Sequence, residues 1–113
     1  MTLIERVRSV GRVEGLFLRD LSVGEKLLVR TRNNRYLFTY LGLGAAKIGN
    51  PAVYPGWQTV DILGSTWGGS TLRVGFIGVG MYLEFQRRGE NKVIVTSSIQ
   101  AIVRLNQTTE ITT

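Results

Sequence analysis

The stretch "LSVGEKLLVRTRNNRYLFTYL", residues 21–41, decides the fold, because apolar and polar side chains alternate on both sides of one short turn. Asn33 and Asn34 tolerate the left-handed backbone that a two-residue hairpin turn requires. Pairing outward from this turn places Arg32 opposite Arg35, Thr31 opposite Tyr36, Val29 opposite Phe38 and Leu27 opposite Tyr40. Because side chains alternate between faces along a strand, Leu27, Val29, Thr31, Tyr36, Phe38 and Tyr40 share one largely apolar face. The stretch therefore predicts a β-hairpin with one buried face.

Further strands are expected downstream of this hairpin. Residues 42–56 predict a connector, because Pro51 and Pro55 argue against a central strand. Residues 57–63 alternate as a strand, and residues 64–70 predict a loop. In residues 71–86 the apolar side chains change face once, which predicts a bulge or bend near Gly75–Gly78. Such a bend would bury both sets, Leu72, Val74 and Phe76 on one side and Ile77, Val79, Met81, Leu83 and Phe85 on the other.

The two ends of the chain carry weaker signals. Residues 2–9 contain Thr2 and Glu5 at capping-box spacing, so residues 1–20 predict a short helix or an arm. Residues 87–91 predict a turn, 92–97 a strand, 98–105 a last strand or one helical turn, and 106–113 a polar tail. Residues 1–113 are therefore expected to form a single all-β domain. Its predicted architecture is a small barrel or sandwich of five to six short antiparallel strands.

Six glycines lie in "GSTWGGSTLRVGFIGVGMYLEF", residues 64–85. A dinucleotide-binding loop needs its glycines between a strand and a helix, whereas "MYLEFQ" alternates as a strand. These glycines therefore indicate strand bends and close backbone contacts, and we expect no cofactor. Trp67, within the predicted loop, is expected to plug the core; the alternative is an exposed stacking or interface residue.

The chain has no cysteine and no histidine. This composition excludes disulfides, thiolate chemistry, a histidine base and the usual ligands of zinc and copper. A hydrolase or transferase would have to rely only on scattered acids and hydroxyls, namely Asp61, Glu84, Ser65 and Ser70. We therefore expect a protein that is not an enzyme and binds no metal. No apolar run approaches the roughly 20 residues that span a bilayer, and charges interrupt any signal-peptide core. We expect a cytoplasmic protein without a membrane partner.

The net charge of +6 suggests an anionic partner, and the basic residues gather at two predicted hairpin tips. Arg30, Arg32 and Arg35 flank the first tip, and Arg87, Arg88 and Lys92 flank the second. They are either a solvated surface or a platform for nucleic acid. Tyr36 lies near the first tip, but the hairpin pairing places it on the buried face.

Three blocks, "TRNNRY", "GSTWGGS" and "YLEF…VTSSIQ", resemble blocks in the same order in small uncharacterised bacterial proteins. The resemblance covers roughly residues 25–102 and implies a compact β unit without catalytic residues. With the small expected core, we predict a non-enzymatic module that works by protein contact as a homo-oligomer. The alternative is a nucleic-acid-binding module that uses the two arginine tips.

Overall fold

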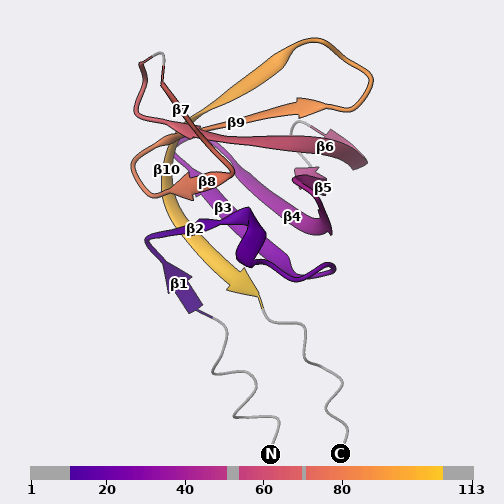
Figure 1. Cartoon of the computed structure of the whole chain (residues 1–113), viewed down its shortest axis with the longest axis horizontal. Helices are drawn as coiled ribbons and strands as arrows, with labels where there is room; N and C mark the ends of the chain where they lie inside the picture. The colour runs from indigo at the N-terminus through magenta and orange to yellow at the C-terminus, as the bar shows by residue number, and fades with distance from the viewer. Residues whose placement is uncertain (1–10, 51–53, 70, 106–113) are drawn as a thin grey trace, which may run out of the picture.

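Six antiparallel strands close into a barrel in the computed structural model, which describes residues 11–50, 54–69 and 71–105 (Figure 1). They are β3 (Lys26–Thr31), β4 (Arg35–Gly42), β5 (Ala45–Asn50), β6 (Tyr54–Thr66), β9 (Tyr82–Arg87) and β10 (Val93–Leu105). Each pairs with the next, and β10 pairs with β3 to complete the ring. The predicted all-β fold is confirmed, in its barrel form.

Four short strands surround this barrel. β1 (Gly11–Val13) pairs with β10 and β7 (Leu72–Val74) pairs with β6, while β2 (Gly15–Phe17) and β8 (Phe76–Gly78) form a separate two-stranded sheet. A 3-10 turn, η1 (Leu18–Asp20), leads toward β3. Residues 11–20 therefore form strands and a turn where a helix or arm was expected. The predicted helix over 2–9 and the tail over 106–113 lie outside the described residues.

The hairpin of β3 and β4 exists and its predicted face is buried, but the predicted register is wrong by two residues. The strand pairs are Arg30 with Arg35, Val29 with Tyr36 and Leu27 with Phe38. The turn residues are Arg32 and Asn33, because the Thr31 N–H donates to the Asn34 carbonyl at 2.8 Å and the Thr31 hydroxyl accepts the Asn34 N–H at 3.1 Å. A shift of two residues keeps every side chain on its face, whereas a shift of one would not.

The barrel interior is built around three aromatic rings. Phe85 lies edge-on to Tyr36 and Phe38, with ring centroids 5.9 and 6.3 Å apart. Burying one large apolar side chain contributes about 1.5–3 kcal/mol. Leu16 of β2 and Ile77 of β8 join the same cluster, so the two-stranded sheet packs onto the barrel core. Other buried members are Leu27, Val29, Ile48, Val60, Leu83, Ile99 and Ile102.

The predicted connector and loop contain strands. Residues 45–50 form β5, in the middle of the sheet, and Ala46 and Ile48 are buried there. Pro55 is the second residue of β6, whereas Pro51 lies outside the described residues. Gly64, Ser65 and Thr66, expected in a loop, continue β6 and pair with β7 on one side and β9 on the other.

Residues 71–86 divide into three short strands. Ile77, Met81, Leu83 and Phe85 are buried as predicted, but Val74 on the other predicted face is 78% exposed. β7 ends at Val74 and Gly75 turns the chain with a φ of +71°, so the first set is not carried inside. Residues 98–105 continue β10 as a strand, with no helical turn. In the described ranges, no helix has the length and apolar character to cross a membrane.

Candidate functional site

The first arginine tip is an exposed cross-strand pair. Arg30 and Arg35 lie directly opposite each other on β3 and β4, and Arg32 lies in the turn between the strands. All three side chains are exposed. The like charges that were expected between Arg32 and Arg35 are therefore found between Arg30 and Arg35.

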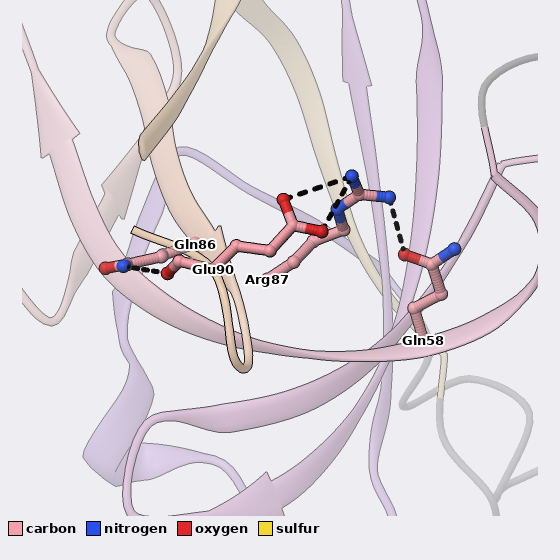
Figure 2. A network of polar contacts seen from close by, with 4 residues as sticks. All are labelled: Gln58, Gln86, Arg87 and Glu90. Carbon is pink, nitrogen blue, oxygen red and sulfur yellow. Dashed lines mark hydrogen bonds and ion pairs between the residues drawn. The ribbon is translucent and has the colours of Figure 1, made fainter. Parts of the chain in front are cut away.

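Two residues of the second tip, Arg87 and Arg88, are engaged by interactions within the protein, whereas Lys92 is exposed. Arg87 donates to the Gln58 Oε1 atom and forms an ion pair with Glu90 at 2.9 Å, while Gln86 donates to the Glu90 carbonyl (Figure 2). Arg88 pairs with Asp61 at 2.6 Å, and this hydrogen bond and the carboxylate charge raise the pKa of Arg88. Arg87 and Arg88 thus hold the β9–β10 hairpin against β6.

The two tips lie at different points along β10. Both border β10, where Ile99 pairs with Thr31 and Val93 pairs with Gln86. Six residues of strand separate these points, which corresponds to about 20 Å at about 3.3 Å per residue. Strand β10 also bends between its two halves, through a register shift between Val95 and Ser98 (Figure 1). A platform formed by both tips stays a prediction.

Trp67 lies on the surface, so its predicted place in the core is wrong. Its side chain is 68% exposed, and the small side chains of Ser65 and Thr66 occupy the inner positions before it. The Thr66 hydroxyl accepts the Gly68 N–H and donates to the Gly69 carbonyl, which fixes the turn that carries Trp67. One edge of the indole lies over Gly80, where a Cβ atom would be 3.1 Å from Cζ3.

The glycine stretch shapes strands, as predicted. Gly75 and Gly80 have φ values of +71° and +89°, and strand β9 follows them where a phosphate-binding loop would need a helix. Residues 78–81 form a turn between β8 and β9, in which the Met81 N–H donates to the Gly78 carbonyl.

An apolar surface beside the β4–β5 turn is the feature that the sequence analysis missed. The β4–β5 turn lies at the other end of β4 from the turn over residues 31–34, and the surface borders Asp61, the partner of Arg88. Leu43 in the β4–β5 turn is fully exposed (104%) and has a φ of +54°. It borders a hollow of about 500 Å³ whose other walls include Leu63, Leu72 and Val74. The signal was "LGLG", residues 41–44, an apolar residue between glycines where a turn favours polar ones.

Two of the residues considered for catalysis are engaged in other contacts. Asp61 binds Arg88, and the buried Ser65 donates to the Phe76 carbonyl at 2.6 Å. Ser70 lies outside the described residues. The part of the chain that the structure describes contains no cluster of three acidic, histidine or cysteine side chains able to hold a metal.

Comparison with known protein families, curated proteins and solved structures finds no match to this chain. The resemblance to small uncharacterised bacterial proteins therefore stays a prediction. Two surfaces of the barrel stand out chemically, the apolar one around Leu43 and the basic outer wall.

Proposed function

We propose that this protein is a non-enzymatic β-barrel module that works by protein contact, and that it self-associates through the apolar surface around Leu43. The exposure of Leu43 carries the proposal. Leucine in the left-handed conformation costs roughly 1–2 kcal/mol, which asparagine or glycine would largely avoid. Leu43 nevertheless adopts this conformation, and its whole side chain is exposed to water.

Neighbouring side chains extend this surface. Val74 across the hollow is 78% exposed, and Val23, whose Cγ2 atom lies close to Gly42, is 72% exposed. Soluble monomers seldom expose contiguous apolar patches of large area, and such patches mark interaction sites. The surface therefore has the chemistry of a protein contact, with Leu43 as its most prominent side chain.

A second copy of the chain is the partner that this surface fits best. Strand β7 borders the hollow and, among the residues that the structure describes, pairs with β6 alone. Two identical edge strands can pair antiparallel about a twofold axis, so an edge beside an apolar patch is self-complementary. Arg19 also lines the hollow, and Asp61 at its rim is already paired with Arg88.

The experiment is sedimentation velocity at several concentrations, with Leu43→Asn as the test variant. The wild type should form species heavier than the 12.6 kDa chain, and Leu43→Asn should shift them toward monomer. Because asparagine accepts a positive φ, the same variant should be at least as stable as the wild type toward urea. Loss of association with retained stability separates a contact residue from a folding residue.

Two further variants complete the test. Val74→Lys places a charge on β7 and should also favour the monomer. Val95→Thr changes an exposed valine on β10, away from the hollow, and should leave association unchanged. A wild type that is strictly monomeric at high micromolar concentration overturns the proposal, as does a Leu43→Asn variant with unchanged association.

A further inference from the structure

A second surface, the outer wall formed by β3, β4, β5 and the start of β6, has a different chemistry. Strands β3, β4, β5 and β6 run side by side there (Figure 1), and the strand pairing places their outward side chains in rows across the strands. One row contains Lys26, Thr39, Lys47 and Thr59, the next contains Leu28, Leu37 and Gly49, and the last contains Arg30 and Arg35. Rows two residues apart along a strand are separated by about 7 Å.

Trp57 lies across the middle of this wall. Its ring covers Gly49 so closely that a Cβ atom there would be 3.0 Å from Cζ3. The side chain is nevertheless 54% exposed, so the ring has one side on the backbone and a large part open to solvent. The Lys26 ammonium lies 5.8 Å from the ring centroid and donates to the Thr39 hydroxyl at 3.0 Å. Because Gly49 has no side chain, the Trp57 ring can lie against the β5 backbone next to basic side chains.

Charge on this wall has one sign. Residues 26–60 contain five basic residues, Lys26, Arg30, Arg32, Arg35 and Lys47, and no aspartate or glutamate. Ion pairs within residues 11–50, 54–69 and 71–105 join Arg87 to Glu90, Arg88 to Asp61 and Arg104 to Glu25, and none of them uses a cation of this wall. Placing Arg30 opposite Arg35 is unfavourable in the free protein, and an anion between them would relieve it.

We propose that this wall binds single-stranded nucleic acid, with a base stacked on Trp57 and phosphates held by Arg30, Arg35, Lys26 and Lys47. An exposed indole bordered by cations offers the two contacts that single strands use, base stacking and backbone neutralisation. A duplex hides the faces of its bases and could use only the cations. The site lies on a different face from Leu43 and does not depend on self-association.

The experiment measures the fluorescence anisotropy of a labelled, mixed-sequence oligonucleotide of about ten nucleotides, a length within the footprint of small barrels. Affinity should fall with salt, with a log–log slope of about −0.7 for each phosphate contact. Trp57→Ala should weaken binding about tenfold or more, the effect of one lost stack, and leave the slope unchanged. Arg30→Gln with Arg35→Gln should reduce the steepness of the slope by about 1.4.

Matched controls use the other tryptophan and other exposed cations. Trp67→Ala removes an exposed indole on another surface, and Arg73→Gln with Lys92→Gln removes the same charge from β7 and from the β9–β10 turn; both should keep wild-type affinity and slope. In a Trp67→Phe background Trp57 is the sole tryptophan, and its fluorescence should be quenched by the oligonucleotide. Lack of binding at low salt overturns the proposal. Equal affinity for duplex or polyglutamate, or Trp57→Ala with unchanged affinity, also overturns it.

Discussion

Gly64 is the residue at which the fold tolerates a side chain least. A Cβ atom there would lie 2.1 Å from the Arg73 carbonyl oxygen, and φ is +144°. Both constraints come from the backbone, because β6 is paired with β7 and β9 at this residue. We expect Gly64→Ala to destabilise the protein by more than about 3 kcal/mol, measured as the urea unfolding free energy.

Gly78 and Gly11 give graded comparisons with Gly64. A Cβ atom on Gly78 would be 2.8 Å from both Met81 Sδ and Phe76 Cε2, which are side-chain atoms that can shift. Gly78→Val should therefore cost more than about 1 kcal/mol but less than Gly64→Ala. Gly11 has nothing within 4 Å of its Cβ position, so Gly11→Ala should leave the urea midpoint nearly unchanged. Equal midpoints for all three variants would contradict this account of the close backbone contacts.

At the scale of elements, the β3–β4 hairpin offers a test of its register. Arg30 pairs with Arg35, so Arg30→Thr removes a like-charge cross-strand contact and should stabilise the protein by about 0.2–1 kcal/mol at low salt. Arg32→Thr, in the turn, should have little effect. Urea unfolding with and without added salt measures both, because salt screens the repulsion. A larger gain for Arg32→Thr would instead support the two-residue turn at Asn33–Asn34.

The same hairpin shows how far the sequence determines an element. Alternation identified the buried face of Leu27 to Tyr40 correctly, because burial depends on parity. It could not distinguish registers two residues apart, since these share a parity; a Thr31 hydroxyl bond selects between them. Strand β5 was missed because the nearby prolines predicted a connector. Its short sequence, "AAKIGN", forms a strand through pairing with β4 and β6, which are separate segments of the chain.

The candidate sites were harder to predict than the fold, because they depend on neighbours distant in sequence. The arginine tips were visible as charge, but Asp61 and Gln58 of β6, which engage Arg88 and Arg87, lie 27 and 29 residues away. The platform at Trp57 depends on Gly49 of the adjacent strand. Exposure of Leu43 follows from a turn whose register the sequence does not specify.

At the scale of the whole molecule, polar side chains lie at both ends of the apolar barrel. Arg87, Gln58 and Glu90 join β9, β6 and the β9–β10 turn at one end (Figure 2). At the other end Arg104, near the end of β10, pairs with Glu25, which precedes β3, at 2.7 and 3.0 Å. These residues are 79 positions apart in the chain, so the pair ties together the first and last strands of the barrel. Hydrogen bonds of this bidentate, charge-assisted kind are stronger than neutral ones.

The Glu25–Arg104 pair should make stability depend on pH in the acid range. Burial alone would raise the pKa of Glu25, but the Arg104 hydrogen bonds, the Ser22 N–H and the Arg104 charge together lower it below 4.5. A carboxyl with a lower pKa in the folded state stabilises the protein above its unfolded pKa, and that stability is lost as pH falls through the folded pKa. We expect the urea midpoint of the wild type to decrease when the pH is lowered below about 4.5, and to decrease less steeply in Glu25→Gln.

Arg104→Gln should flatten the pH profile of stability in the same way. The double variant should lose no more stability than the two single variants lose together, because each single variant already removes the same interaction. Profiles for Glu25→Gln and wild type that run parallel through the acid range would show that this pair does not hold the barrel end together.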